Sequence, residues 1–322
     1  MVAPALIDDA EVARLLPPEA VLAAIARAFV DPPAAPPRIA AEVDDGNGRS
    51  RTLLAMPALR RDGIATIKLV TVRRGSGIGL SSHLLVLDRD GAPLALVEAH
   101  ALTARRTAAA SVLAAEALGV GGARTLAVFG AGRQARAQIE AFAAAMPIEE
   151  VRLWARRTDA AEALADFARA YVDTARVAGD PAEAVAGVDV VTCATGSTVP
   201  LVRSSAVMPG AHVDLVGGFR PDMREADDAL IVRATVVADT AAALSEAGDL
   251  AQPIARGLLS PDRVVLLADL LARPRRRREG EVTLFKSVGH AAEDLVVTEL
   301  LLERLGLAPV ASAGGGPAKG RE

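Results

Sequence analysis

The sequence predicts an α/β protein with a Rossmann-type parallel sheet domain and a smaller α+β domain. Three observations support this prediction. The chain has 322 residues, more than one hydrophobic core usually organises. From Thr125 onward, short apolar runs alternate with helical patterns, as in a parallel sheet that is covered on both faces. Before residue 119, strand-like runs are joined by a hairpin signal, which indicates an antiparallel sheet with flanking helices.

Composition narrows the classes of function. The net charge is −4, so nothing favours a nucleic-acid partner. The single cysteine, Cys193, excludes a disulfide within the chain and argues against a structural metal site, and its apolar surroundings predict a small core residue. The sequence shows no signal-peptide pattern and no apolar run of the roughly 18 residues that a membrane span needs. We therefore expect a cytoplasmic protein with no membrane contact and no metal.

In the first third of the chain, residues 9–30 predict two short helices separated at Pro17-Pro18, because proline cannot continue a helix. Residues 31–37 are proline-rich and extended. Strands are then expected at 51–56, 65–72, 82–88 and 93–98, with a hairpin turn at Asp88–Gly91. Residues 103–118 predict a strong alanine-rich helix with Thr103 as its N-cap and Gly119 as its stop.

The remainder predicts the parallel sheet. The expected elements in chain order are a strand at 125–129, a helix at 133–145, a strand at 151–155, a helix at 159–171 capped by Asp159, and strands at 188–194, 212–217 and 234–238. A closing amphipathic helix is expected at 291–306. We assign residues 1–119, together with 291–308, to a substrate-binding and dimerisation domain and residues 120–290 to the cofactor domain. Residues 309–322 are expected to be a disordered tail.

A glycine-rich turn follows the strand at 125–129. Its sequence is Gly130-Ala131-Gly132-Arg133-Gln134-Ala135, which fits G-x-G-x-x-A between a strand and a helix. The first glycine allows the tight turn, the second lets the backbone approach a pyrophosphate, and the alanine lets helix and strand pack closely. The helix N-terminus then directs free N–H groups at the phosphates, so the turn predicts a dinucleotide site.

The end of the next strand predicts which dinucleotide binds. An NAD site usually has an acidic residue there to bind the ribose 2′-hydroxyl, but this strand runs into Arg156-Arg157-Thr158. Two guanidinium groups suit a 2′-phosphate. We therefore expect NADP(H), with NAD(H) as the alternative. Lysine is rare in this arginine-rich chain, so Lys68 and Lys286, which lie inside ordered-looking segments, are candidates for specific roles.

Taken together, the motifs resemble those of the ornithine cyclodeaminase/μ-crystallin family over nearly the whole chain, to about residue 306. The matching segments are Pro37-Arg38, Met56-Pro57, IKLVTV with Lys68, LTARRTAA (102–109), GAGRQA (130–135), CATGSTVPLV (193–202), HVDLVGGFRPDMREADD (212–228), ALSEAGDL (243–250) and LFKSVG (284–289).

The resemblance implies a homodimer and a clamp for the substrate's α-carboxylate, made by Arg38, Lys68 and Arg106, with Lys68 and Arg106 as the catalytic candidates. It also implies that further residues line the cofactor: Thr107, Ala194, Thr195, Val216, Gly217 and Ser287. Three cations from separate elements suit a carboxylate, which agrees with this assignment.

Two departures from the family pattern bear on the substrate. Cyclodeaminases carry an aspartate directly after the Gly217-Gly218 position, where it handles the substrate's distal amine, whereas this chain has Phe219. The segment that follows resembles the family's ketimine reductases, and Asp222 is only a weak substitute for the missing acid. Residues 76–83 lack the Pro-Thr pair that is common in relatives. His83 there is a candidate proton donor, although a packed or surface histidine is the favoured interpretation.

We therefore expect NADPH-dependent reduction of a cyclic 2-imino acid, Δ1-pyrroline-2-carboxylate or Δ1-piperideine-2-carboxylate, to proline or pipecolate, with Phe219 covering the substrate's apolar ring. Three alternatives stay open. They are an ornithine or lysine cyclodeaminase with tightly bound NAD, a dehydrogenase of open-chain amino acids or opine-like imines, and a non-catalytic, μ-crystallin-like protein that binds a small ligand.

Overall fold

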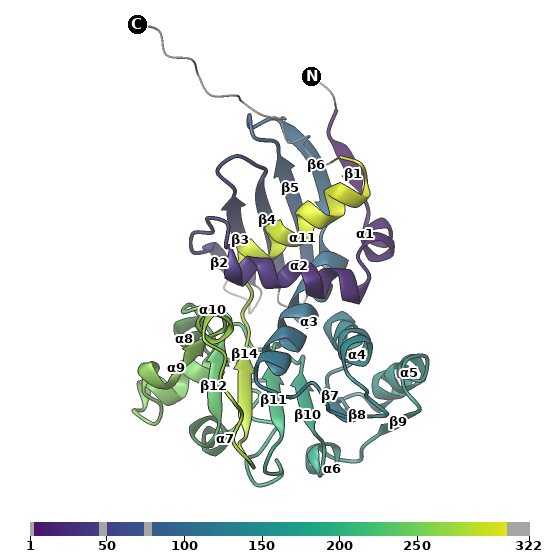
Figure 1. Ribbon diagram of the computed structural model, residues 1–322, viewed down its shortest axis with the longest axis vertical. Coiled ribbons are helices and arrows are strands. Elements are labelled where there is room, and N and C mark those ends of the chain that lie inside the picture. Colours follow the sequence, from purple (N-terminus) through teal and green to yellow (C-terminus); the bar gives the residue numbers. More distant parts are fainter. Residues whose placement is uncertain (1–2, 45–49, 74–78, 308–322) are drawn as a thin grey trace, which may run out of the picture.

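The computed structural model describes residues 3–44, 50–73 and 79–307. They form one sheet of six strands and one of eight. The two sheets lie at opposite ends of the molecule, with the helix α3 (His100–Ala117) between them (Figure 1). The predicted α/β class, with a parallel sheet and a second, smaller sheet, is confirmed.

The smaller sheet has the order β1-β6-β5-β4-β3-β2 and is antiparallel except between β1 and β6. Its strands are β1 (Ala5–Ile7), β2 (Ile39–Asp44), β3 (Ser50–Leu59), β4 (Ala65–Arg73), β5 (Gly79–Leu87) and β6 (Pro93–Glu98). The sequence predicted β3 to β6 but neither edge strand. Helices α1 (Asp9–Leu15) and α2 (Pro18–Val30) are separated at Pro17, as predicted. Burial alternates along β4, so Lys68 lies on the inward face.

The larger sheet is parallel throughout, in the order β13-β12-β14-β11-β10-β7-β8-β9. Its strands are β7 (Thr125–Phe129), β8 (Glu150–Trp154), β9 (Thr174–Val177), β10 (Val190–Cys193), β11 (His212–Leu215), β12 (Thr235–Ala238), β13 (Val265–Leu266) and β14 (Thr283–Lys286). The strand order changes direction between β7 and β10, and ligands of such sheets bind beyond the carboxyl ends of the strands at this point.

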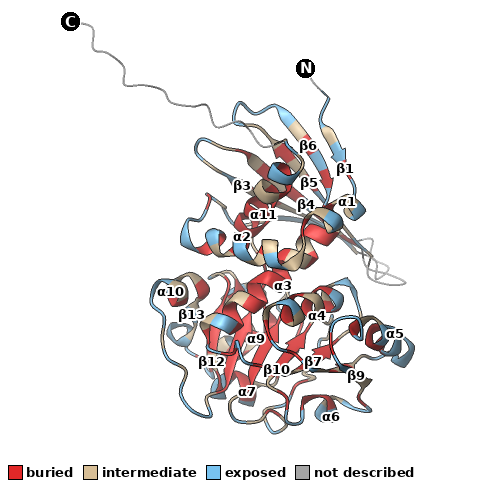
Figure 2. Ribbon diagram, turned by 45° about the vertical axis from the view of Figure 1, so that its right-hand side comes forward, coloured by how far each residue is buried: buried red, intermediate tan, exposed pale blue. Residues whose placement is uncertain are grey.

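The helices of the larger sheet are short except for the first two. They are α4 (Arg133–Ala145), α5 (Thr158–Ala168), α6 (Pro181–Val185), α7 (Asp228–Arg233), α8 (Ala243–Glu246), α9 (Gly248–Ala255) and α10 (Leu267–Ala272), with a 3₁₀ turn at Pro261–Arg263. β7 and α4 have the bounds that the sequence predicted. The strands β9, β13 and β14 were not predicted. Figure 2 shows buried residues concentrated in this sheet and in α3.

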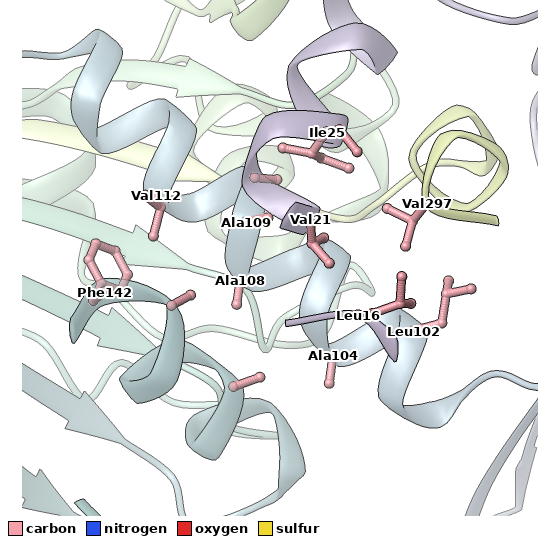
Figure 3. Close-up of a cluster of buried hydrophobic side chains, with 14 of the residues drawn as sticks. Leu16, Val21, Ile25, Leu102, Ala104, Ala108, Ala109, Val112, Phe142 and Val297 are labelled. Carbon is pink, nitrogen blue, oxygen red and sulfur yellow. The ribbon is translucent and has the colours of Figure 1, made fainter. Parts of the chain in front are cut away.

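Helix α3 joins the two halves of the core. It packs against α2 on one side and α4 on the other. Figure 3 shows the small side chains of Ala104 and Ala108 where these helices meet, with Val21, Ile25 and Phe142 nearby. Alanine keeps neighbouring helices close, because the distance between helix axes depends on the side chains at the contact. The alanine-rich stretch that predicted a helix therefore also determines how tightly it packs.

The closing helix α11 (Ala291–Arg304) packs against α2, β3 and β4, so the end of the chain returns to the smaller sheet. The segment 287–290 makes the crossing directly from β14. Nearly all of α11 that faces this sheet is buried, including two acidic residues of its first turn, Glu293 and Asp294. A surface amphipathic helix would carry such residues in solvent, so their burial indicates partners.

Two predicted helix caps are wrong. Helix α3 begins at His100, because the Asp9 carboxylate accepts a hydrogen bond from the Ala101 N–H at 2.6 Å; Thr103 lies inside the helix. Helix α5 begins at Thr158, and Asp159 pairs with Arg157 instead of capping. Residues 76–78 of the segment without a Pro-Thr pair, and the tail 309–322, lie outside the described residues. No helix in the described part of the chain is long and apolar enough to cross a membrane.

Candidate active site

The glycine turn has the geometry that a dinucleotide site needs. Gly130 has φ +100°, and a Cβ there would lie 2.5 Å from the Ala194 carbonyl oxygen, so the loops after β7 and β10 touch at this glycine. Gly132 forms the N-cap of α4 with no side-chain hydrogen bond, and the space beside it is open. The free N–H groups of α4 therefore face a volume into which a pyrophosphate fits.

A cavity of about 500 Å³ opens beside this turn. Its lining includes Gly130, Ala131, Ala194 and Thr195, together with the end of β8 and the residues after it. Arg156, Arg157 and Thr158 are exposed there, but only the two arginines line the cavity. Arg157 is bound to the Asp159 carboxylate at 2.6 Å and 3.1 Å, whereas Arg156 makes no ion pair among the described residues. The free positive charge at the predicted ribose position is therefore that of Arg156.

Two of the three predicted clamp cations lie together and are buried. Lys68 Nζ is 2.8 Å from Asp294 Oδ1 and 2.7 Å from Oδ2. Arg106 donates from Nη1 to Glu293 Oε2 at 2.7 Å and from Nε to Asp294 Oδ1 at 3.1 Å. Lys68 is 1% exposed and Arg106 5% exposed. The two carboxylates of α11 thus hold both cations in one place, and the helix N-terminus in turn stabilises the carboxylates.

The third cation, Arg38, directly precedes β2 at the edge of the smaller sheet. Its Nη2 donates to the Val288 carbonyl at 3.1 Å and to the Gly289 carbonyl at 2.6 Å, and its Nε is 3.3 Å from Glu246 Oε2. Gly289 has φ +70°, and a Cβ there would lie 2.2 Å from Arg106 Nη1. Gly289 therefore contacts both guanidinium groups: its carbonyl accepts from Arg38, and a side chain in its place would displace Arg106.

Burial lowers the pKa values of Lys68 and Arg106, whereas the neighbouring carboxylates raise them. Burial lowers the pKa of Lys68 to about 8, although Asp294 opposes the shift. Burial would also lower the pKa of Arg106, but the neighbouring carboxylates, Glu293 first, outweigh it and the pKa is raised. Glu293 itself has a raised pKa because it is buried. The cations are already balanced by carboxylates behind them, so a substrate carboxylate would bind through directed N–H donors more than through net charge.

The clamp opens into a cavity of about 350 Å³ between the two sheets. Arg38, Lys68 and Arg106 all line it, and so do Arg133 and Gln134 of the glycine turn. The 500 Å³ cavity is lined by Gly130 and Ala131, the residues of the turn that precede them. The clamp therefore shares its cavity with the first residues of α4, and the glycine turn connects this cavity to its neighbour.

Beyond the cations, the cavity floor is mainly apolar. The strand register places Leu54, Val70 and Ser82 side by side in the layer next to Lys68, and Thr52, Val72 and Leu80 in the layer after that. All of these except Thr52 line the cavity, and Phe219 and Val216 line its opposite wall. Phe219 thus reaches the same cavity as the clamp. The lining contains Arg38, Lys68, His100, Arg106 and Arg133 as its charged or titratable groups, and no Asp or Glu among the described residues.

The other predicted cofactor residues are divided between the two cavities. Thr107, Val216 and Ser287 line the cavity of the clamp. Gly217 lies between the two loops, where a Cβ would come within 2.1 Å of the Thr195 carbonyl oxygen. Ser287 donates to Asp239 at 2.9 Å, and the same carboxylate accepts from the Val288 and Gly289 N–H groups. Asp239 therefore fixes the segment that crosses from β14 to α11.

Two candidates lie away from the clamp. Asp222 is exposed, pairs with Arg220, and lines a neighbouring hollow instead of the clamp cavity. His83 is exposed, with its Nδ1 3.5 Å from the Ser81 hydroxyl, and does not line the clamp cavity. His100, which received little weight from the sequence, does line it, and its pKa is lowered by burial and by Arg133. No group of three or more potential metal ligands occurs among the described residues.

A second set of buried charges lies beneath the cofactor loops; the sequence singled out its lysine, Lys286, but not its acidic partners. Lys286 Nζ lies 3.3 Å from Asp249 Oδ2 and 4.0 Å from Glu225 Oε2, and all three residues are fully buried. Glu225 accepts hydrogen bonds from the N–H and hydroxyl of Thr195, both at 2.8 Å, and from the Gly217 N–H at 2.9 Å. We call this set the Lys286 cluster. Its carboxylates tie together the loops that follow β10 and β11.

Comparison with known proteins identifies the family. A model of the ornithine cyclodeaminase/mu-crystallin family matches residues 6–307. The chain belongs to this family. Its relatives include a Delta(1)-pyrroline-2-carboxylate reductase of Paracoccus denitrificans, 40% identical over 68% of this chain and 71% of the relative. The mouse ketimine reductase mu-crystallin is 36% identical over 74% of this chain and 75% of its own length. The resemblance that the sequence motifs indicated is confirmed.

Solved structures support the same placement. The Delta(1)-pyrroline-2-carboxylate reductase of Thermococcus litoralis, in complex with NADH and L-proline, matches with a TM-score of 0.86 and 27% identity over 95% of this chain and 99% of that one. The iminosuccinate reductase of Paracoccus denitrificans, in complex with NAD⁺, matches with a TM-score of 0.84 and 26% identity over 95% of this chain and 98% of that one. The family members named here are thus reductases of imine substrates.

Proposed function

We propose that this family member reduces a cyclic 2-imino acid, of the Δ1-pyrroline-2-carboxylate or Δ1-piperideine-2-carboxylate class, with a nicotinamide cofactor. One observation carries the proposal: the three cations Arg38, Lys68 and Arg106 and the start of α4 border a single cavity. The names of the relatives support the same reaction.

The chain's own groups divide the work. Lys68 keeps at least one ammonium proton beyond its Asp294 partner, and Arg106 keeps its Nη2, so both can donate to a carboxylate. Phe219 and Val216 offer an apolar wall to the ring methylenes. When bound, a reduced nicotinamide would supply a hydride to C2 of the protonated imine, whose C=N electron pair would move to the nitrogen and give the neutral amine. Holding C2 against the nicotinamide ring would lower the activation barrier substantially, because the entropic cost of bringing the two reactants together is met on binding.

The charge of the cavity separates this proposal from the alternatives. A cyclodeaminase must hold a distal ammonium, but the described lining of the clamp cavity has no carboxylate. An intact clamp beside an open cofactor turn argues for chemistry over simple ligand binding. The experiment follows NADPH and NADH oxidation with both cyclic imines and with pyruvate plus amines, and follows ammonia release from ornithine with NAD⁺. Reduction of a cyclic imine is expected; ammonia release without imine reduction would overturn the proposal.

We further propose that NADP(H) is preferred, because Arg156 lines the cavity without a carboxylate partner among the described residues. The solved relatives with NADH or NAD⁺ bound make this a point for experiment. Arg156→Ala should raise the KM for NADPH by roughly 10- to 100-fold, since a bond to a charged group contributes about 1.5–3 kcal/mol, and should leave that for NADH nearly unchanged. Arg157→Ala is the matched control, with a smaller effect expected because Asp159 already neutralises Arg157. Equal losses for both cofactors would refute the preference.

We also propose that the chain forms a homodimer through the outer face of the smaller sheet. That face exposes several large apolar side chains, each at least 40% exposed: Leu6, Ile39, Val43, Leu53, Leu59, Leu69 and Leu96. Exposed apolar area of this extent usually marks an interface. An archaeal alanine dehydrogenase of the same fold, 25% identical with a TM-score of 0.84, is a dimer with bound NAD. Sedimentation of Leu69→Arg should then give a monomer, and a wild-type monomer would refute the proposal.

A further inference from the structure

Two hydroxyl groups on the wall of the clamp cavity have no hydrogen-bond partner among the described residues. They belong to Ser82 and Thr103. Ser82 is 1% exposed. A buried hydroxyl left without a partner costs about 1–3 kcal/mol, so such groups usually bind protein, water or a ligand. An unpaired hydroxyl that lines a cavity therefore points to something that binds there.

The backbone places Ser82 near the strand that carries Lys68 and near the start of the helix that carries Arg106. In the register of the sheet, Ser82 lies opposite Val70, one inward-facing position along from the Leu84–Lys68 pair. Its carbonyl accepts a hydrogen bond from the Ala99 N–H at 2.9 Å, directly before α3, the helix that carries Arg106. Its neighbours on the inward face of β5 are Leu80 and Leu84. Ser82 is thus a single hydroxyl in an apolar stretch beside the clamp.

The cavity needs a group that accepts a hydrogen bond. Its charged lining is entirely basic, and the nearest carboxylates, Glu293 and Asp294, are already bound to Arg106 and Lys68 behind the wall. A cyclic imine is reduced in its protonated form, whose N–H requires an acceptor, and the amine product presents an N–H as well. A serine hydroxyl can accept such a bond without adding charge to the site.

Resting on the function proposed above, we propose that the Ser82 hydroxyl accepts a hydrogen bond from the ring N–H of the bound imino acid. The clamp holds the carboxylate and Ser82 holds the nitrogen. Together they fix the rotation of the ring about the bond between C2 and the carboxylate, which the clamp alone leaves open. Ser82 then selects 2-imino acids over carboxylates of the same shape that lack an N–H.

Two planar probes isolate this contact from turnover. Pyrrole-2-carboxylate has a ring N–H, and furan-2-carboxylate has a ring oxygen in the same place. Calorimetry should show that the wild-type protein with bound cofactor prefers the pyrrole by about 10-fold, the factor that about 1.4 kcal/mol gives. Ser82→Ala should reduce the preference to less than about twofold, and Ser82→Thr should restore most of it, because the bond needs only the hydroxyl.

Thr66 supplies the matched control. Its hydroxyl is also buried and without a partner among the described residues, and it lies on the same inward face of β4 as Lys68, but it does not line the cavity. Thr66→Val should leave the pyrrole preference and the kcat/KM for the cyclic imine unchanged. Ser82→Ala should lower that kcat/KM by about 10- to 100-fold without lowering thermal stability, because it removes a hydroxyl that had no protein partner.

The outcomes distinguish this inference from the function on which it rests. If neither carboxylate binds and no imine is reduced, the proposed function fails. If both bind with equal affinity to the wild-type protein, or if Ser82→Ala keeps the full preference, only the role of Ser82 fails. The wild-type comparison decides the matter even if Ser82→Ala does not fold.

Discussion

The described residues include two buried lysines, Lys68 and Lys286, each beside two buried acids, and the two sets have different roles. At the clamp, Lys68 and its neighbour Arg106 are bound to Asp294 and Glu293 of α11, and the cations line the cavity. In the Lys286 cluster, the lysine is enclosed, and the acids Glu225 and Asp249 bind backbone N–H groups: Glu225 those of Thr195, Gly217 and Gly218, and Asp249 those of residues 225 and 226. In the first set the acids hold the cations at the cavity wall. In the second set the lysine neutralises acids that bind the backbone.

The difference lies in where the unused hydrogen-bonding capacity points. A buried ion pair by itself adds little stability, since desolvation offsets the attraction. At the clamp, the spare donors of Lys68 and Arg106 face a cavity and remain available to a ligand. In the Lys286 cluster, the carboxylate oxygens accept hydrogen bonds from the loops that border the cofactor turn. Burial raises the pKa of Glu225 to about 7, and Lys286 and the hydrogen bonds from Thr195 oppose the shift.

The largest effect is expected at the enclosed lysine. Lys286→Met removes the cation next to Glu225 and leaves Asp249 with Arg224 alone, whose Nε lies 3.8 Å from Asp249 Oδ1; breaking such a buried set usually costs about 3–5 kcal/mol of unfolding free energy. Urea unfolding of the variant measures the loss. Adding Asp249→Asn to Lys286→Met removes one of the stranded charges and should recover part of it. A loss below about 0.5 kcal/mol, the range of ordinary surface substitutions, would show that the cluster is not what holds the loops.

At the clamp, we expect a substitution of Lys68 to lower the unfolding free energy less but to reduce kcat/KM for the substrate strongly. Lys68→Met removes a donor from the carboxylate and should lower kcat/KM by about 30- to 5,000-fold, since truncating one partner of a buried charged hydrogen bond costs about 2–5 kcal/mol. The KM for the cofactor should stay nearly constant, because Lys68 lines the clamp cavity and not the cavity beside the glycine turn. Fluorescence titration with NADPH provides the control. Equal losses of substrate and cofactor affinity would mean that the two cavities are not separate in function.

The smallest effect is a pH dependence. The pKa of Lys68 is about 8, lowered chiefly by burial and further by Arg106, and raised in part by Asp294 and Glu293. Its ammonium charge is therefore lost above about pH 8, and the affinity for pyrrole-2-carboxylate should fall there. The same shift makes the unfolded chain bind more protons than the folded one between pH 8 and the ordinary lysine value of 10.5, so Lys68 alone makes unfolding free energy rise with pH over that interval. Affinity that stays flat to pH 9.5 would contradict the assigned pKa.

The fold was predictable where local signals agree. The strand β7, the turn at Gly130–Gly132 and the helix α4 have the predicted bounds, because the glycine pattern, the apolar run and the helix period all point to one arrangement. The edge strand β2 was missed because all of its residues are exposed, so it has no alternating burial pattern to read. The cap of α3 was misassigned because Asp9, 92 residues away, supplies it.

The sequence predicted the residues that line the cavity but not the buried carboxylates that hold these residues in place. Arg38, Lys68 and Arg106 were assigned from motifs, and the structure brings all three to one cavity. Glu293 and Asp294 read only as acidic residues at the start of a helix, where they are common for reasons of the helix dipole. Glu225 and Asp249 lie inside segments that matched the family but carried no assigned role. No local pattern pairs residues this far apart, because the pairing depends on how the chain crosses between the sheets.

The crossing at residues 287–290 also sets an order of assembly. Lys68 and its partner Asp294 are 226 positions apart, and the acidic residues of α11 are made only when synthesis is almost finished. The larger sheet also waits for the end of the chain, because β14, which lies between β12 and β11, is directly followed by the crossing. Since chains generally fold from the N-terminal side as they emerge, the glycine turn is made early, but its sheet and the counter-ions of Lys68 and Arg106 are completed together at the end of synthesis.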